Sequence, residues 1–402
     1  MANVSSSNGL EKRPKLRFPG FDEPWQSTLL SSVFTKNTKK NTDGQITNVI
    51  CNSAKQGLIP QREYFDKDIA NSDNTSGYYI IEENDFVYNP RKSADAPYGP
   101  ISRYKYAEAG IVSPLYLCFR AKKEINPSFF EWYFRSSAWH RYVYMSGDSG
   151  ARHDRVSIKD DTFFAMPINL PSAHEQEHIA SFLERIDQRI EKQRALVESL
   201  KKYKRGVVKA ILSKRIRFAD DRGNYYPEWS ECTLQEVVDF LDGQRKPLES
   251  ADRAKRQGKY PYYGASGIID YIDDYIFDEP LLLLGEDGAN IINRSSPLCF
   301  IATGKYWVNN HAHVMRPRKG QNIKFICELL ESLDYTRYNT GTAQPKLNQE
   351  KCRQIALHLP TYEEQCHIAE FLSLVEQKSI HAQTELDSLF RTKNALMQQL
   401  FI

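Results

Sequence analysis

The chain has 402 residues and a mass of 46.5 kDa, which is enough for two or more domains with cores of their own. Its hydrophobic fraction of 41% and charged fraction of 26% are those of an ordinary soluble globular protein. The formal net charge of +3 excludes a uniformly basic protein, so a nucleic-acid site would have to concentrate positive charge on one face.

Cysteine usage and targeting signals indicate a reducing, cytoplasmic setting. The seven cysteines are an odd number without a C-x-x-C pair, so neither a disulfide framework nor a zinc site is expected. Residues 1–15 are polar and lack an apolar core, which excludes a secretory signal and predicts a disordered tail. No apolar run reaches the roughly 18 residues of a membrane span, so no membrane association is expected.

The first predicted domain covers residues 16–171 and opens with Leu16–Pro19, Pro24–Trp25 and Thr28–Leu29. Its hydrophobic patterns predict short strands and one amphipathic helix. The strands are expected at 78–81, 86–88, 111–112 and 115–119, and the helix at 127–143. This mixture predicts a small α+β domain.

Basic and aromatic side chains alternate in a loop rich in Pro and Gly at 89–106. Such a loop suits phosphate contacts combined with readout of base edges. The opposing interpretation is that a basic run is a solvated face and that the aromatic residues are half-buried strand residues. The candidate DNA contacts here are Arg91, Lys92, Tyr98, Ser102, Arg103, Lys105 and Tyr106.

A long helix is predicted over residues 172–213. Leu170–Pro171 ends the preceding strand, Ser172 can cap the helix, and Glu175 is placed to complete a capping box. Apolar residues then recur in steps of four and three, a period of about 3.5 that is typical of a coiled coil. The seam residues are Ile179, Leu183, Ile186, Ile190, Val197 and Leu200.

The second predicted domain covers residues 214–360 and opens like the first, with Ile216–Ala219, Trp229 and Thr233–Leu234. Strands are expected around 281–284, 298–303, 306–308 and 313–316, and a helix at about 322–335. Two stretches, 260–267 and 305–311, combine aromatic residues with short polar side chains. The candidate DNA contacts are Tyr262, Tyr263, Ser266, Lys305, Asn309, Asn310 and His311.

A second long helix, at 361–402, repeats the first. Thr361 and Glu364 stand at the cap positions. The seam residues are Ile368, Leu372, Val375, Leu386, Leu389 and Leu396. The two helix starts lie 189 positions apart, as do Lys204 and Lys393, whereas the two domain openings lie 200 apart (Phe18 and Phe218). The chain is therefore two copies of one plan, and we expect the helices to pair with each other rather than each to pack only on its own domain.

No catalytic or metal site can be identified. The chain lacks both G-x-x-x-x-G-K-[ST] and G-x-G-x-x-G. Glu286 and Asp287 resemble the acidic pair of a nuclease metal site, but two acidic residues directly after a strand more often stabilise the turn itself. His178 and His367 lie on helices without an H-E-x-x-H motif.

Taken together, these motifs resemble the specificity subunit of Type I restriction–modification systems. The resemblance runs from about residue 15 to the end. It is carried by the two openings and by the paired helix starts Leu170–Leu183 and Leu359–Leu372. Further similar stretches are Tyr88–Arg91, Gly110–Pro114, Pro261–Gly267, Gly285–Asn290, Lys305–His313 and Gly341–Leu347.

This resemblance implies a non-catalytic subunit that binds double-stranded DNA. Each domain would be a target recognition domain reading one half of an asymmetric split target, and two antiparallel helices would set the gap. Two methylation subunits carrying S-adenosylmethionine would dock on the helical regions. Restriction subunits carrying ATP and Mg would join them, so no cofactor is expected in this chain. A specificity subunit that works with methylation subunits alone, without restriction subunits, stays open as a variant of this interpretation.

Two alternatives remain from the residues alone. An autonomous DNA-modifying enzyme would methylate or cut DNA without a partner. A coiled-coil scaffold would bind partners without any sequence preference.

Overall fold

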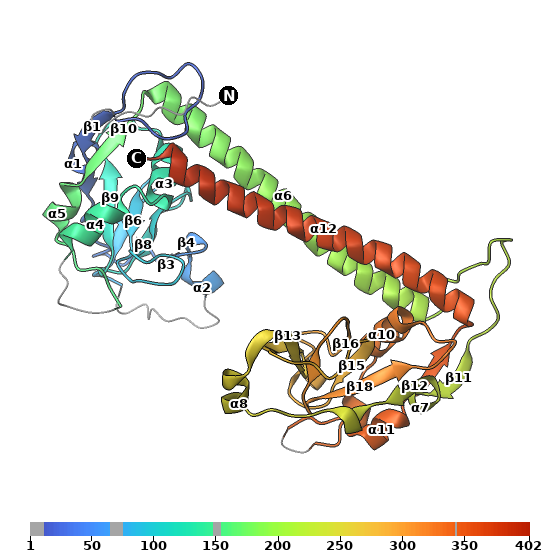
Figure 1. Cartoon of the computed structure of the whole chain (residues 1–402). Helices are drawn as coiled ribbons and strands as arrows, with labels where there is room; N and C mark the ends of the chain where they lie inside the picture. The colour runs from blue at the N-terminus through green and yellow to red at the C-terminus, as the bar shows by residue number, and fades with distance from the viewer. Residues whose placement is uncertain (1–11, 65–74, 148–153, 342–343) are drawn as a thin grey trace. The chain divides into compact units, whose positions relative to one another are not determined.

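A computed structural model describes residues 12–64, 75–147, 154–341 and 344–402 (Figure 1). They fall into two compact units. The first contains the chain up to Arg194 together with Glu385–Ile402, and the second contains Ala195–Thr384. Most of the expected disordered tail, residues 1–11, lies outside the described residues. At its end, the carbonyl of Lys12 accepts a hydrogen bond of 2.8 Å from the backbone N–H of Trp25.

The first unit is built from short antiparallel strands and short helices. The central sheet has the order β2-β9-β6-β7, and three two-stranded pairs accompany it: β1-β10, β3-β4 and β5-β8. The strands are β1 Gln26–Leu29, β2 Phe34–Lys36, β3 Ile50–Ser53, β4 Gly57–Pro60, β5 Tyr79–Ile81, β6 Phe86–Tyr88, β7 Ile101–Arg103, β8 Gly110–Val112, β9 Leu117–Ala121 and β10 Pro167–Leu170. The short helices are α1 Leu30–Val33, α2 Gln61–Tyr64, α3 Pro127–Arg135, α4 His140–Ser146 and α5 Asp160–Phe164.

The second unit repeats this plan. Its central sheet has the order β12-β18-β15-β16, and β11 pairs with β19 as β1 pairs with β10. A three-stranded sheet of order β14-β13-β17 takes the place of the two-stranded pairs β3-β4 and β5-β8. The strands are β11 Ser230–Thr233, β12 Val238–Phe240, β13 Gln257–Gly264, β14 Gly267–Ile272, β15 Leu281–Gly285, β16 Cys299–Ala302, β17 Trp307–Val308, β18 Ala312–Pro317 and β19 Ala356–Leu359. The helices are α7 Leu234–Val237, η2 Asp242–Gln244, α8 Ser250–Lys255, α9 Asn290–Asn293, α10 Ile323–Ser332, η3 Thr336–Tyr338 and α11 Gln349–Arg353.

One amphipathic helix closes the core of each unit. The side chain of Asn126 caps α3 and that of Asn322 caps α10, each accepting a backbone N–H of the first turn. In the first unit α3 packs Phe130 and Phe134 against Phe34 and Phe119, with ring centroids 5.0–6.2 Å apart. Edge-to-face aromatic pairs of this kind add to the free energy gained by burying apolar surface.

The single helix predicted at 127–143 is wrong in one respect, because it is two helices. The chain leaves α3 at Ser136, which adopts an extended conformation, and the hydroxyl of Ser136 donates to the carbonyl of Tyr133. The indole of Trp139 then donates to the carbonyl of Phe134. These side-chain bonds satisfy free carbonyl groups in the last turn of α3, so that the chain can leave this helix and begin α4 in a new direction.

The two long helices are α6, Ala173–Leu212, and α12, Tyr362–Leu400. In the first unit, Asp187 of α6 binds Lys393 of α12, and in the second unit Lys204 of α6 lies 3.3 Å from Glu376 of α12. Asp187 and Glu376 are 189 positions apart, as are Lys204 and Lys393, so the repeat generates the same ion pair twice. Rising numbers on α6 meet falling numbers on α12, which makes the pairing antiparallel within each unit.

The predicted fold class is confirmed. The structure has two mixed α and β units of the same topology, two long antiparallel helices and an internal repeat. All twelve predicted seam residues are buried or half-buried. Among the described residues, no helix is both long enough and apolar enough to cross a membrane.

The predicted capping boxes are half right. The hydroxyls of Ser172 and Thr361 accept the backbone N–H groups of Glu175 and Glu364, at 3.2 and 3.4 Å. The two carboxylates, however, turn to the opening segments of their units. Glu175 binds Arg17 through two bonds of 2.8 Å, and Glu364 accepts the indole N–H of Trp229 at 3.2 Å.

Candidate nucleic-acid interface

In the first unit, Arg91 and Lys92 stand at a turn that follows strand β6. The side chain of Asn89 accepts the backbone N–H of Arg91 at 3.1 Å, and the backbone N–H of Lys92 donates to the carbonyl of Asp154 at 2.9 Å. The backbone is thus held on both sides. Both side chains are exposed, and neither charged end has a partner among the described residues.

Arg91 and Lys92 line a groove of about 930 Å³, which we call the Arg91 groove. Its other wall is the β3–β4 hairpin and the start of α2. The side-chain amides of Gln56 and Gln61 come from this wall and have no hydrogen-bond partner among the described residues. Free amides and guanidinium groups are the side chains that read base edges most specifically.

Two asparagine side chains that line the Arg91 groove, the buried Asn52 and the half-buried Asn89, bond to the backbone beneath it. Asn52 is 5% exposed and donates to the carbonyl of Val87, while Asn89 donates to the carbonyl of Asn52. These bonds tie hairpin β3–β4 to strand β6. Our sequence reasoning missed Gln56 and Gln61 because they lie 30 or more positions before Arg91. The turn sequence Lys55–Gly57 was the available signal for that hairpin.

Asn89, Ser93, Asp95 and Pro100 of the 89–106 stretch also line this groove, but the other candidate DNA contacts of the stretch do not. Arg103 and Lys105 are bound within the unit: Arg103 donates to Asn84 at 2.8 Å, and Lys105 lies 2.8 Å from the buried carboxylate of Glu131.

Three further candidates of this stretch have partners within the unit as well. Tyr98 packs its ring 4.7 Å from that of His140, and Ser102 donates to the side chain of Asn52. Tyr106 is 38% exposed beside the ring of Tyr104. Of the seven candidate DNA contacts in this stretch, Arg91 and Lys92 therefore line the groove, and the other five belong to the framework of the unit.

In the second unit, the stretch 260–267 lies in a hairpin formed by β13 and β14. Tyr262 is fully buried in it, and its hydroxyl accepts the backbone N–H of Leu248 at 2.9 Å, so this side chain presents no surface to a ligand. Tyr263 is half-buried against Phe300. Ser266 lies exposed at the turn.

The stretch 305–311 is split between surface and interior. Lys305 is exposed, with its ammonium 4.6 Å from the ring centre of Tyr275. Asn309 is 5% exposed, and its side chain accepts the backbone N–H of His311. Asn310 and His311 are exposed at the turn that Asn309 holds.

Four turns meet around these residues and form what we call the four-turn surface: Gly264–Gly267, Gly285–Gly288, Asn309–His311 and Gln344–Lys346. Their backbones bond directly: Asn309 N–H donates to Tyr263, Glu286 N–H to His311, and Gly288 N–H to Pro345. At Gly285, a Cβ would lie 2.6 Å from the carbonyl of Ala265, so only glycine permits this approach.

Glu286 and Asp287 serve these turns. Glu286 binds Arg245 at 2.9 Å and lies 3.5 Å from Lys346, while Asp287 binds the imidazole of His311 at 2.8 Å. The interpretation of this pair as turn residues fits these contacts. No group of three or more His, Cys, Asp or Glu side chains able to hold a metal ion occurs in the described part of the chain.

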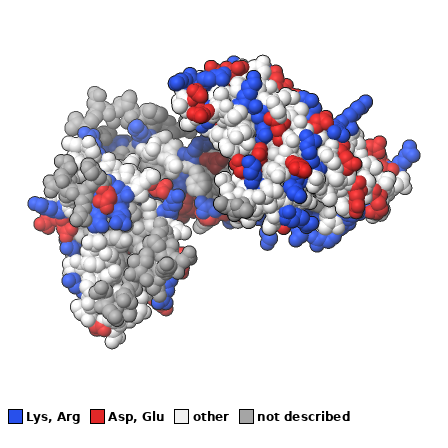
Figure 2. Space-filling model, turned by 90° about the horizontal axis from the view of Figure 1, so that it is seen from below, with Lys and Arg blue, Asp and Glu red and all other residues white. Residues whose placement is uncertain are grey.

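Lysine and arginine are interspersed with acidic side chains on the face shown in Figure 2. Many basic groups are already paired, as Arg253 is with Asp270 at 3.0 Å and Arg256 is with Asp273 at 2.9 Å. The unpaired charges of Arg91 and Lys92 therefore indicate a DNA contact better than the net charge does, because a DNA phosphate can bind these side chains without breaking an existing ion pair.

Comparison with known proteins places this architecture in a family. The family model described as "Type I restriction modification DNA specificity domain" matches residues 23–201 and again 226–389. A type I restriction enzyme specificity subunit of Haemophilus influenzae is 32% identical over 145 residues, which is 36% of this chain and 36% of that protein. The specificity subunit of the Escherichia coli enzyme EcoprrI is 28% identical over 146 residues, covering 36% of this chain and 35% of its own length. The aligned regions thus span about a third of these curated relatives.

Solved structures share the fold over nearly the whole chain. The S subunit of a Type I restriction–modification system from M. genitalium matches with a TM-score of 0.56 and 16% identity, over 97% of this chain and 99% of its own. The HsdS subunit of Thermoanaerobacter tengcongensis matches with a TM-score of 0.52 and 17% identity, over 96% and 98%. A chain from a study of complex assembly in the type I R-M system reaches 0.62 at 16% identity, over 95% and 98%.

Proposed function

The chain belongs to the Type I restriction modification DNA specificity family, and from that membership we propose that it is the non-catalytic, DNA-reading subunit of a Type I complex. The observation that carries the proposal is the repeat itself. One plan occurs twice, with the same central sheet and closing helix, but the polar surfaces built on the two copies differ.

Each unit would read one half of a split DNA target. In the first unit, the Arg91 groove presents two amides, a guanidinium and an ammonium whose side chains have no partner among the described residues. In the second, the four-turn surface presents Ser266, Asn310, His311 and Lys346. Because arginine favours guanine and glutamine favours adenine in the major groove, the first half-site would contain both bases.

The long helices would set the gap between the half-sites. A helix of 40 residues is about 60 Å long, and two readers on one groove face stand about one helical turn of DNA, ~34 Å, or a multiple of it apart. Two methylation subunits with S-adenosylmethionine would dock on the helical regions. Restriction subunits with ATP and Mg would complete the assembly, so the chemistry would lie entirely in the partners.

The test is to co-express this chain with a cognate methylation subunit and to map modified adenines across a genome by single-molecule sequencing. We expect one split, asymmetric motif that disappears when this chain is omitted. A stable complex without any modified motif would contradict the proposal and favour a scaffold. Modification by this chain alone would favour an autonomous enzyme.

A further inference from the structure

His313 lies in strand β18 with both ring nitrogens bonded to acceptors. Nδ1 lies 2.7 Å from the carboxylate of Asp242, and Nε2 lies 2.8 Å from the backbone carbonyl of Leu347. The side chain is 1% exposed. Burial raises the pKa of Asp242, but the hydrogen bonds from His313 and from the backbone N–H of Val314 lower it below its ordinary value, so Asp242 is an ionised carboxylate. Neither this carboxylate nor the carbonyl can donate a hydrogen, so both ring nitrogens carry one and the ring is a buried imidazolium.

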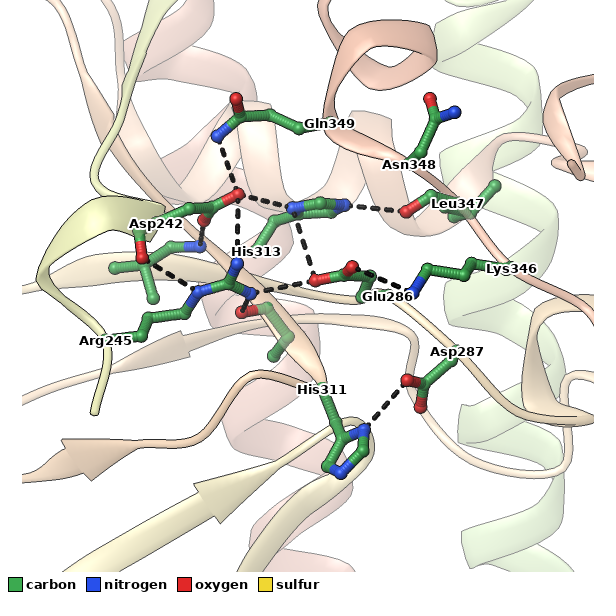
Figure 3. A network of polar contacts seen from close by, with 12 residues as sticks. Asp242, Arg245, Glu286, Asp287, His311, His313, Lys346, Leu347, Asn348 and Gln349 are labelled. Atoms are coloured by element: carbon green, nitrogen blue, oxygen red, sulfur yellow. Dashed lines mark hydrogen bonds and ion pairs between the residues drawn. The ribbon is translucent and has the colours of Figure 1, made fainter. Parts of the chain in front are cut away.

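This imidazolium begins a polar network that runs from the interior to the four-turn surface (Figure 3). The side-chain exposure rises along it, from 1% at His313 to 13% at Glu286 and 50% at Lys346. Arg245 links Asp242 to Glu286, at 3.5 and 2.9 Å. The network thus reaches surface side chains that would face DNA.

The network also holds the turns through their backbones. His313 binds the carbonyl of Leu347, and the N–H of Leu347 donates to the carbonyl of Glu286 at 2.7 Å. Asp242 accepts the backbone N–H of Val314 and the amide of Gln349, which fixes η2 to strand β18 and to α11. The buried His313–Asp242 ion pair therefore holds the turns that carry Asp287 and Lys346 from the interior of the unit.

We propose that His313, paired with Asp242, is a positioning residue for sequence recognition by the second unit: it orders the four-turn surface before DNA binds, and only its charged form can do so. The inference rests on the proposed function. If the four turns are already ordered, binding DNA costs no further conformational entropy in them. A residue that does not touch DNA can therefore still affect the affinity for DNA.

The surroundings of His313 explain why the charge persists. Burial by itself lowers the pKa of the ring, but the hydrogen bond to Asp242 and the neighbouring thiol of Cys352 raise it to about 10. Glu286 adds a second carboxylate 3.9 Å from Nδ1. Arg245, which binds both of these acids, carries a positive charge that opposes the charge of the ring. The pair should thus remain intact at neutral pH and be lost as the pH rises towards 10.

Two substitutions separate the charge of His313 from its hydrogen bonds. His313→Gln keeps the size but can donate to only one of the two oxygens. In Asp242→Asn, the new amide can donate to Nδ1 of a neutral imidazole, whose Nε2–H still donates to Leu347. The side-chain amide of Gln349, which donates to Asp242 in the wild type, would turn over so that its oxygen accepts a hydrogen bond from the new amide. This control keeps the hydrogen bonds with His313, Val314 and Gln349, loses the ion pair with Arg245, and removes the need for an imidazolium.

The experiment uses the complex with the methylation subunit and duplex DNA carrying the motif mapped for the wild type. For His313→Gln we expect about tenfold faster amide exchange in peptides containing Gly285–Gly288 and Leu347, and relaxed base preference in one half-site only. The other half-site is the internal control.

The second measurement is the pH dependence of DNA affinity. Between pH 7.5 and 10, the affinity of the wild type should fall about twofold more than that of Asp242→Asn, because half of the His313 rings have lost a proton when the pH equals the pKa.

Three outcomes would overturn the inference: an unchanged motif with His313→Gln, equal loss of both half-sites, or the same pH profile for wild type and Asp242→Asn. If the wild-type complex shows no split motif at all, the proposed function fails instead. The amide-exchange measurement needs no DNA and still reports whether His313 orders the turns.

Discussion

At the scale of single residues, hydrogen bonding separates candidate DNA contacts from framework. Arg91 and Lys92 keep their charged ends exposed, whereas Arg103 and Lys105 in the same stretch are engaged by Asn84 and Glu131. A group with a good internal partner loses that partner when it binds DNA, so its net contribution to affinity is smaller.

This difference predicts distinct effects for two neighbouring substitutions. Arg91→Ala should cost about 1–3 kcal/mol on the cognate site and relax one base position, because arginine can bind guanine through two hydrogen bonds. Lys92→Ala should weaken binding to all sequences alike and lower the salt slope by about one. Titrations of the complex against cognate and mutated duplexes at several salt concentrations measure both. If the two variants behave identically, the assignment of Arg91 to base reading is wrong.

At the scale of elements, the two copies use equivalent buried glutamates differently. Glu175 is neutralised by Arg17, whereas Arg217, the equivalent of Arg17, binds Glu228 and the carbonyl of Tyr226. The first copy has Pro24 where the second has Glu228, so Arg17 has no competing acid there. Among the described residues, Glu364 accepts hydrogen bonds only from neutral donors, the indole N–H of Trp229 and the backbone N–H of Phe218, and its burial raises its pKa above the ordinary value.

Replacement of the glutamate by glutamine should therefore change the stability of the two units differently. Glu175→Gln removes a doubly bonded ion pair and should destabilise the first unit by about 1.5–3 kcal/mol. A raised pKa means that Glu364 favours folding at low pH and that this contribution is lost as the pH rises through the folded-state pKa. Glu364→Gln at pH 8 should then leave the second unit as stable as before or more stable. Urea unfolding followed by hydrogen exchange within each unit measures both; a large loss at Glu364 would show that its charge is needed.

The long helices make a second prediction at this scale. One heptad inserted at Arg194–Ala195 of α6, matched by one at Thr384–Glu385 of α12, keeps the antiparallel pairing of both units in register. The insertion adds about 10 Å, or roughly three base pairs of DNA. We expect methylome mapping to show a longer gap between unchanged half-sites. Changed half-sites would refute the role of the helices in spacing. A heptad added to α6 alone is the control that should disrupt pairing.

At the scale of the whole molecule, repeated topology is combined with unlike surfaces. The central sheets correspond strand for strand and each unit has one closing helix, but the hairpin β3–β4 and the antiparallel pair β5-β8 of the first unit are replaced by the β14-β13-β17 sheet of the second. A shared framework with different polar turns would let two readers be attached to the same partners in the same way.

From this asymmetry we expect two different half-sites. The Arg91 groove presents arginine and glutamine, while the four-turn surface presents serine, asparagine and histidine, and such sets do not select the same bases. Mapping of modified adenines in cells that carry the complex should give a non-palindromic split motif. A palindromic motif would contradict the assignment of one half-site to each unit.

Periodicity and repetition in the sequence were sufficient for the architecture. The seams of α6 and α12, the paired openings and the central strands at 86–88, 281–284 and 313–316 follow from local hydrophobic patterns, which depend on near neighbours. The expected strand at 115–119 begins two residues later, at Leu117, and the helix at 127–143 is interrupted, because side-chain bonds to the backbone decide such boundaries.

Only the tertiary structure decided which polar residues act together. Gln56 and Gln61 join Arg91 because a hairpin folds across strand β6, and Tyr262 is removed from the surface because β13 is a strand in a sheet. His313 lies 71 positions from Asp242, and no local pattern links them. Hydrophobic periodicity is a local property of the chain, whereas a hydrogen bond between distant segments forms only once the core has brought them together. The architecture was therefore predictable, and the two surfaces proposed for DNA recognition were not.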